Sequence, residues 1–215
     1  MKARPILFSG PMIRVLLDGS KTQTRRLVKS HPLIDGGNFT DGFVRLPENH
    51  VIDDCPYGKP GDLLWVRETT RNRMLRVIYA ADDATALDPI GRECGWNYSR
   101  NVCPGIHMPR ALSRLTLRVT DVRVERLQEI SEADAVAEGT FPGAVYPPAG
   151  MTDHQVLAWK PDQSAAGVSA KNGYRSLWES INGPGSWDAN PWVWVISFEC
   201  IKANVDGVMA EKKAA

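Results

Sequence analysis

The stretch that decides the fold is SRLTLRVTDVRVERL, residues 113–127. Apolar residues take the odd positions from Leu115 to Val119 and the even positions at Val122 and Val124. Such alternation is typical of a strand with one buried face. The phase changes at the Thr-Asp pair in the middle, which indicates a bulge or a sharp bend. A strand bent in this way is expected to wrap round a small β-barrel.

Further elements are predicted on both sides of this strand. Short apolar segments bounded by turn residues predict strands at residues 5–8, 63–68, 76–80 and 192–201. Helices are predicted between Pro11 and Gly19, between the capping-box residue Ser131 and Gly139, and around Tyr174, Leu177, Trp178 and Ile181 before Asn182-Gly183-Pro184.

This order of elements contains no βαβ alternation and no internal repeat, so it predicts an α+β fold. We expect a small mixed β-barrel with peripheral helices, forming a single domain over residues 1–203. Residues 29–61 and 140–172 are rich in loop-forming residues and are predicted to be two long loop insertions. The small, charged tail at 204–215 is expected to be disordered.

The composition excludes several classes of protein. The 215 residues, 43% of them apolar, suffice for one good core or two small ones. No segment has the roughly eighteen apolar residues of a membrane span, and the N-terminus lacks a secretory pattern. The lack of such a segment predicts no membrane partner, and the four dispersed cysteines favour a reduced, cytoplasmic protein.

The basic residues are unevenly distributed although the net charge is only +1. Residues 1–30 carry seven Lys and Arg against Asp18 alone, and residues 91–130 carry seven Arg against four acids. This asymmetry fits a local phosphate contact better than a long duplex interface, although a solvated basic face is an equally ordinary explanation.

The segment GSKTQTRR, residues 19–26, concentrates polar side chains that a core would not accept unpartnered. Lys21 and Thr24 face the same way if this segment is helical, whereas Lys21 shares a face with Gln23 if it is extended. In either case an amine and a hydroxyl are available to one site. A Lys whose pKa is lowered by burial can activate a hydroxyl nucleophile. The alternative is a solvated basic turn.

Four other residues are candidates outside that segment. Glu138 falls in the last turn of its predicted helix, where the helix dipole disfavours a carboxylate, so it needs a cationic partner or tolerates exposure. Trp187 lies in a Gly/Ser-rich loop and is a candidate for stacking on a base, and Arg67 and Glu68 either pair structurally or line the barrel mouth.

No metal or cofactor is predicted. The four histidines are dispersed, no glycine-rich phosphate loop is present, and a zinc site at Cys94, Cys103 and Cys55 is only a weak alternative.

The order of these motifs resembles the ASCH (ASC-homology) domain family, a PUA-like group of small β-barrels associated with RNA and modified nucleosides. Gly19-x-Lys21-x-x-Thr24-x-Arg26 resembles the family signature G-x-K-x-x-T-x-R, and residues 59–62 resemble its K-x-G-D turn. The likeness spans most of residues 5–200. The segments CPYGKPGD and GSWDANPW further resemble longer members found in bacteriophages and prophages.

The resemblance implies an amidohydrolase, because small bacterial members of the family remove the acetyl group from N4-acetylcytidine. Carried over by motif, the catalytic residues would be Lys21, Thr24 and Glu138. Arg25, Arg26, Arg67, Glu68 and Trp187 are then expected to bind substrate. The two insertions are longer than in compact members, which leaves the acyl group and the size of the substrate open.

The alternative is a non-catalytic PUA-like module that binds RNA or another modified nucleic acid. In that case Arg25, Arg26 and the Arg-rich region at 100–126 would contact phosphates, and Trp187 would stack on a base. The expected partner is therefore a modified cytidine nucleoside or RNA. The sequence gives no evident protein partner.

Overall fold

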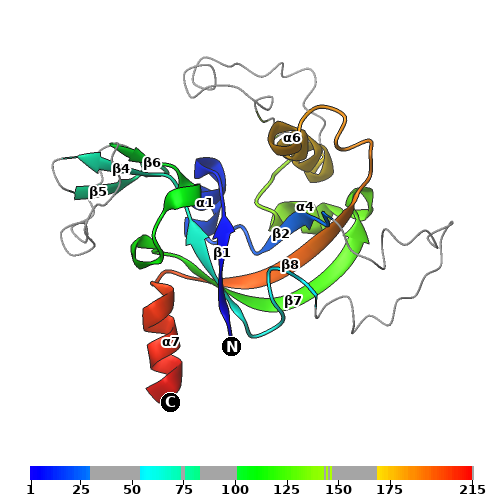
Figure 1. The fold of residues 1–215 in the computed structure, drawn as a ribbon. Coiled ribbons are helices and arrows are strands. Elements are labelled where there is room, and N and C mark those ends of the chain that lie inside the picture. Colours follow the sequence, from blue (N-terminus) through cyan, green and yellow to red (C-terminus); the bar gives the residue numbers. More distant parts are fainter. Residues whose placement is uncertain are drawn as a thin grey trace. The chain divides into compact units, whose positions relative to one another are not determined.

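The computed structural model describes residues 1–29, 54–73, 76–82, 101–142, 144, 146 and 169–214 (Figure 1). Most of the two predicted insertions lies outside these residues. The strands are β1 (Ala3–Leu7), β2 (Gln23–Leu27), β3 (Leu63–Arg67), β4 (Thr70–Arg73), β5 (Arg76–Tyr79), β6 (Val102–Cys103), β7 (Thr116–Arg126) and β8 (Trp192–Ile201). The α-helices are α1 (Gly10–Leu17), α4 (Glu132–Ala137), α6 (Ala170–Asn182) and α7 (Val205–Ala214), with 3-10 turns at Gly105–His107, Arg110–Leu112 and Leu127–Glu129.

The fold is mixed α+β, and its strands form two sheets. The larger sheet has the order β1-β3-β7-β8-β2, and the smaller sheet has the order β5-β4-β6. β1 runs parallel to β3, whereas β3 with β7 and β2 with β8 are antiparallel pairs. The order of the larger sheet begins at β1 and ends at β2, so among the described residues it has two edges. The predicted α+β class is therefore confirmed, whereas the strands of this part of the chain do not form a closed barrel.

The chain divides into two compact units, which we describe separately. The first contains residues 1–19, 56–121 and 198–215, and the second contains residues 20–55 and 122–197. The sequence predicts one domain over residues 1–203 and does not indicate these two units. Both long strands continue from one unit into the other.

The phase change predicted in β7 is confirmed by its pattern of burial. Leu117 and Val119 are buried, Thr120 and Asp121 are both exposed, and Val122 is buried again with the opposite parity. The boundary between the two units falls directly after Asp121. The buried residues Leu117 and Val119 of β7 thus belong to the first unit, and the buried Val122 belongs to the second.

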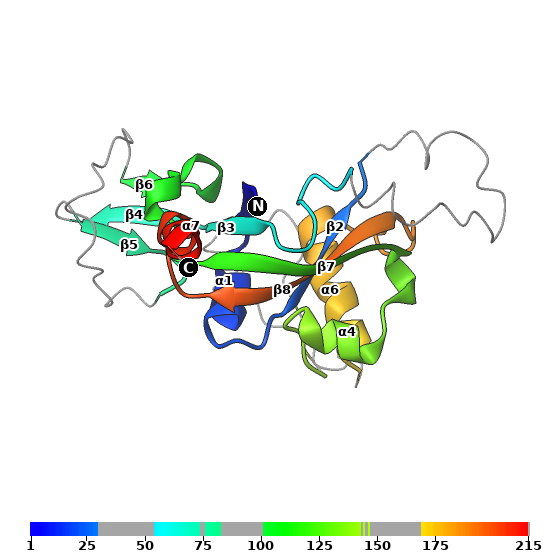
Figure 2. The ribbon, with the colours of Figure 1, turned by 90° about the horizontal axis from the view of Figure 1, so that it is seen from below.

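In the second unit, α4 and α6 pack against each other (Figure 2). Ser131 begins α4 by accepting a hydrogen bond from the backbone N–H of Asp134 at 3.0 Å, as the capping pattern predicts. Gly139 follows this helix with φ of 82°, a conformation that glycine adopts without strain. These local signals fix the end of α4 and therefore the position of Glu138.

Helix α6 matches its predicted segment, with one difference. Tyr174, Leu177 and Trp178 are buried as the helical spacing predicts. Ile181, which the spacing assigned to the same face, is 58% exposed in the last turn. Gly183 follows the helix with φ of 96° and ends it one residue before Pro184.

The predicted disordered tail is wrong, because residues 205–214 form helix α7 in the first unit. Val205 and Val208 pack against the fully buried Leu63, together with the partly buried Met209. Asn204 accepts the backbone N–H of Asp206 at 2.9 Å and donates to the carbonyl of Ser113 at 2.8 Å. Tertiary contacts therefore order a segment whose composition alone does not predict a stable helix.

Among the described helices, none combines the length and the apolar content needed to cross a bilayer.

Candidate functional site

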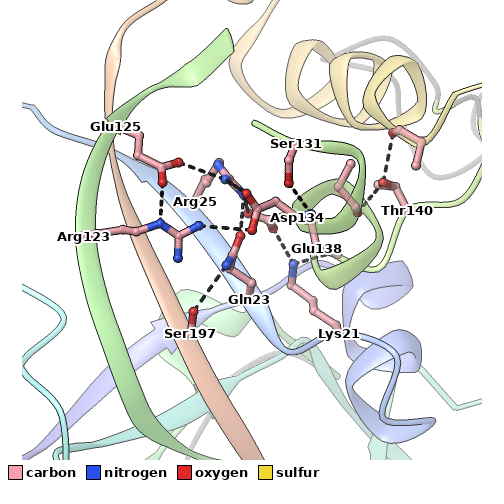
Figure 3. A network of polar contacts seen from close by, with 12 residues as sticks. Lys21, Gln23, Arg25, Arg123, Glu125, Ser131, Asp134, Glu138, Thr140 and Ser197 are labelled. Atoms are coloured by element: carbon pink, nitrogen blue, oxygen red, sulfur yellow. Dashed lines mark hydrogen bonds and ion pairs between the residues drawn. The ribbon is translucent and has the colours of Figure 1, made fainter. Parts of the chain in front are cut away.

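A buried ion pair joins Lys21 to Glu138 in the second unit (Figure 3). The Nζ of Lys21 donates to Oε2 of Glu138 at 2.7 Å and to the backbone carbonyl of the same residue, also at 2.7 Å. Both side chains are 2% exposed. The backbone N–H of Thr22 donates to the carbonyl of Ala137 at 2.8 Å, which fastens the segment before β2 to the end of α4.

This contact gives Glu138 the cationic partner that its position at the helix end requires. Glu138 is the C-cap residue of α4, where carbonyl groups lack helical partners and the dipole is negative. The ammonium group of Lys21 binds one such carbonyl and the carboxylate together. The sequence therefore singled out Glu138 correctly as a residue in need of a partner.

Burial lowers the pKa of Lys21 below its ordinary value. Desolvation is the largest cause, because it disfavours the charged ammonium form. Glu138 acts in the opposite direction and raises the pKa, whereas the positive charges of Arg26 and Arg25 lower it further. The lowered pKa gives Lys21 a larger neutral fraction than an exposed lysine has, as a general base requires.

A second buried cation, Arg25, lies on the other side of Glu138. Its side chain is 0% exposed. Nη1 donates to Oε1 of Gln23 at 2.6 Å and lies 3.4 Å from Oε1 of Glu138. Nη2 lies 3.1 Å from Glu125 and 3.3 Å from Asp134. Arg25 therefore holds three carboxylates, and its guanidinium is enclosed by them.

Arg123 of β7 completes this network on its more exposed side. It pairs with Glu125 through Nε and with Asp134 through Nη2, the latter at 3.1 Å. Burial acts to raise the pKa of Asp134, but a hydrogen bond with Ser131 and the charges of Arg25 and Arg123 hold that pKa below its ordinary value. The cluster thus joins three cations to three carboxylates, which compensates the cost of burying them.

An aromatic residue that the sequence assigned only to the helix core, Tyr174, also belongs to this region. Burial, together with the negative charge of Glu138, raises the pKa of Tyr174 well above its ordinary value. The Cζ atom of Arg25 lies 5.9 Å from its ring centroid. The helical spacing of Tyr174 predicted burial, but nothing local in the sequence indicated that its neighbours would be charged.

Thr24 and Arg26 occupy the strand face opposite to that of Gln23 and Arg25, because side chains alternate along β2. Thr24 is 4% exposed and stands opposite Ile196 of β8. Among the described residues, the polar network labelled in Figure 3 does not include Thr24. Arg26 is half-buried, and its charge affects the pKa of both Lys21 and Tyr174.

The ring of Trp187 is 6% exposed and packs edge-on against Tyr174, with centroids 6.3 Å apart. The loop position of Trp187 suggested a more open ring. Its predicted stacking on a base stays a prediction, and such stacking requires a face of this buried ring to become accessible.

Arg67 and Glu68 belong to the first unit and are described apart from the cluster. The Cζ atom of Arg67 lies 5.3 Å from the ring centroid of Trp65, and its Nη2 donates to the carbonyl of Ile106. Glu68 is buried and forms a two-pronged pair with Arg114, at 2.8 and 3.0 Å. Of the two interpretations left open for Glu68, these contacts support the structural pairing.

Among the described residues, no group of three or more His, Cys, Asp and Glu side chains has the arrangement of a metal site. Cys94, one member of the weak zinc alternative, lies outside them.

No family model, no curated protein and no solved structure matches this chain. The likeness to the ASCH family therefore stays a prediction from the sequence motifs.

Proposed function

We propose that the protein is a metal-independent amidohydrolase that acts on N4-acylated cytosine nucleosides or nucleotides. Lys21, Thr24 and Glu138 are its proposed catalytic residues. The observation that carries the proposal is the buried Lys21–Glu138 pair, in which burial lowers the pKa of the amine. The proposal also draws on the resemblance of residues 19–26 to the ASCH signature.

In the proposed reaction, the neutral amine of Lys21 takes a proton from the attacking hydroxyl, which belongs to Thr24 or to a water that Thr24 positions. Thr24 receives this role from the family signature alone, since its side chain lies on the face of β2 opposite to Gln23 and Arg25. The hydroxyl oxygen bonds to the acyl carbon, and the carbonyl electron pair moves onto its oxygen. The Lys21 ammonium then stabilises this oxyanion.

As the carbon–nitrogen bond breaks, Glu138 accepts from the Lys21 ammonium the proton that the hydroxyl gave up and passes it to the exocyclic nitrogen, which releases the free amine of cytosine. If Thr24 is the nucleophile, water then hydrolyses the resulting ester. The overall products are a carboxylic acid and the deacylated nucleoside, with one water consumed.

The other predicted binding residues receive different support. Arg26 is the basic residue of the signature whose charge reaches Lys21, which fits contact with an anionic group of the substrate. Arg67 and Trp187 are retained as proposed substrate contacts from the sequence, and Glu68 more weakly because Arg114 already holds it.

The alternative of a non-catalytic nucleic-acid module assigns phosphate contacts to Arg25, to Arg26 and to the Arg-rich region at 100–126. The burial of Arg25 and its three carboxylate partners count against that role. We favour the hydrolase because of the buried Lys21–Glu138 pair, which a binding module does not require.

The decisive experiment incubates the purified full chain with N4-acetylcytidine and follows deacetylation by chromatography. Lys21→Met, Thr24→Val and Glu138→Gln are each expected to lower the rate by about 10²–10⁴-fold. Arg175→Gln, an exposed change on α6, is the matched control and is expected to retain the rate. Circular dichroism confirms that each variant is folded. A folded wild-type protein without deacetylase activity, or a folded Lys21→Met with the wild-type rate, would contradict the proposal.

A further inference from the structure

We propose that Arg25 is a positioning residue that fixes the carboxylate of Glu138 against the amine of Lys21. This inference deepens the proposed function and rests on it for the catalytic use of Lys21. The sequence assigned Arg25 to substrate or phosphate binding, so the new role replaces that prediction.

The first argument is that two different cations hold the two oxygens of Glu138. Oε2 accepts from Lys21 at 2.7 Å, and Oε1 lies 3.4 Å from Nη1 of Arg25. With a cation at each oxygen, the carboxylate cannot rotate freely about its last torsion. Its position relative to the amine of Lys21 is therefore fixed from the side opposite to that amine.

The second argument is that Arg25 is itself held rigidly. Gln23, Glu125 and Asp134 engage its two Nη atoms, at 2.6, 3.1 and 3.3 Å. Its Nε is buried and has no hydrogen-bond partner among the described residues. An unpartnered buried donor is costly. The guanidinium therefore keeps an orientation in which its two Nη atoms bind the carboxylates while its Nε stays without a partner. This orientation is expected if Arg25 serves to hold the carboxylates in place.

The third argument is electrostatic. The charged groups that act on Lys21 are Glu138 at the end of α4, and Arg25 and Arg26 of β2, while Tyr174 of α6 lies close enough to feel the charge of Glu138. Removing Arg25 has two effects on Lys21. It removes a neighbouring positive charge, and it leaves Glu138 to interact with the ammonium alone. Both effects favour the protonated form, so Arg25 helps to keep the amine available as a base.

The test measures the titration of Lys21 without any substrate. The protein is labelled with ¹³C at the lysine Cε atoms, and the Lys21 resonance is assigned from its absence in Lys21→Met. Arg25→Gln is expected to raise the midpoint of this titration by about one pH unit. Arg25→Lys retains a charge but cannot hold Glu138 and the other two carboxylates together, so it should raise the midpoint by less.

Arg123→Gln is the matched control. It removes a charge from the same network, but Figure 3 shows the contacts of Arg123 going to Glu125 and Asp134, the two carboxylates of the network other than Glu138. This variant is expected to lose stability and to leave the midpoint of Lys21 unchanged. If Arg25→Gln does not fold, Arg25→Lys decides the question. A wild-type midpoint in the folded Arg25 variant overturns the positioning role, and so does an equal shift in Arg123→Gln.

The rate of deacetylation against pH provides a separate measurement. The acidic limb of the wild-type profile should move to higher pH in the Arg25 variant, by the same amount as the titration of Lys21. If the wild-type protein has no activity, the proposed function fails. The titration of Lys21 still tests whether Arg25 acts on Lys21 through Glu138. If the titration moves but the profile does not, Arg25 does not position the catalytic base, and the inference is overturned.

Discussion

Lys21 donates two hydrogen bonds from one Nζ atom to one residue, to the carboxylate and to the backbone carbonyl of Glu138, each at 2.7 Å. The same contact therefore satisfies a carbonyl group at the end of helix α4 and pairs two buried charges. Because the stability of the helix end and the proposed chemistry share these atoms, experiments have to separate a loss of folding from a loss of function.

A double-mutant cycle measures how much the Lys21–Glu138 pair contributes to stability. Lys21→Met leaves Glu138 buried with only the longer contact to Arg25, so we expect the free energy of unfolding to fall by about 3–5 kcal/mol. Lys21→Met/Glu138→Leu removes both charges and should lose less than the sum of the single variants, with a coupling of about 0.5–3 kcal/mol. Urea unfolding measures all four proteins. Strictly additive losses would mean that the interaction between Lys21 and Glu138 does not stabilise the folded protein.

The pH dependence of stability reports on Lys21 directly. Because burial holds the pKa of Lys21 below its ordinary value of 10.5, the unfolded chain binds more protons than the folded chain between the two pKa values. The contribution of Lys21 to the free energy of unfolding therefore rises with pH across that window, and it is lost as the pH falls through the folded pKa.

Lys21→Met lacks this group and supplies the reference. The stability of the wild-type protein relative to Lys21→Met should increase as the pH rises towards the ordinary lysine pKa of 10.5, as measured by urea unfolding at several pH values. A difference that does not change with pH would show that the folded and unfolded chains titrate alike at this position.

A second prediction on charge concerns Arg114 in the first unit, which holds Glu68 and Asp82 together. Arg114→Met leaves the buried Glu68 without its partner and should cost about 3–5 kcal/mol at neutral pH. Burial raises the pKa of Glu68 even with Arg114 present. Acidification towards that pKa should therefore protonate Glu68 and reduce the loss.

The control for this variant is Arg118→Met, since Arg118 pairs with Glu199 on the exposed surface. An exposed pair contributes about 0–1 kcal/mol, so thermal unfolding of this variant should be close to that of the wild type. Equal losses in the two variants would contradict the importance of burial.

Gly58 tests the geometry of the turn before β3. It has φ of 95°, and an added Cβ would lie 2.5 Å from Nη1 of Arg4 and 2.9 Å from Oδ2 of Asp62. These two side chains are themselves paired at 2.8 Å. Gly58→Ala should therefore destabilise the protein by more than the about 1–2 kcal/mol that a left-handed conformation costs any L-residue.

Gly185→Ala is the matched control for that strain. Gly185 has φ of 76°, but nothing lies within 4 Å of its added Cβ. The difference between the two alanine variants in chemical denaturation measures the steric conflict at Gly58. If Gly185→Ala is equally destabilised, the contact with Arg4 and Asp62 is unimportant.

The sequence predicted those features that depend on neighbouring residues. The strand at 192–201 is confirmed residue for residue, because its apolar alternation and the preceding turn are local patterns. The end of α4 is confirmed for the same reason, since Ser131 and Gly139 supply its boundaries. Glu138 was identified because a carboxylate at that place opposes the helix dipole.

What could not be predicted depends on contacts between distant segments. The open edges of the larger sheet follow from strand pairing, which the patterns of single strands do not specify. Helix α7 is ordered by Leu63, more than a hundred residues away, and not by its own composition. The burial of Arg25 depends in the same way on Glu125 and Asp134, so its basic neighbours in the sequence suggested a phosphate contact instead.

At the exposed Thr120–Asp121 pair of β7, the alternation of buried and exposed side chains shifts by one residue. Deleting either residue would restore a single inward and outward rhythm and would turn Val122 and every later side chain of the strand to the opposite face. Surface loops in general tolerate a change of length at little cost. The middle of this strand, in contrast, cannot gain or lose one residue without turning Val122 and the residues after it to the other face. The number of residues between Val119 and Val122 is therefore more strictly constrained than the identity of those residues.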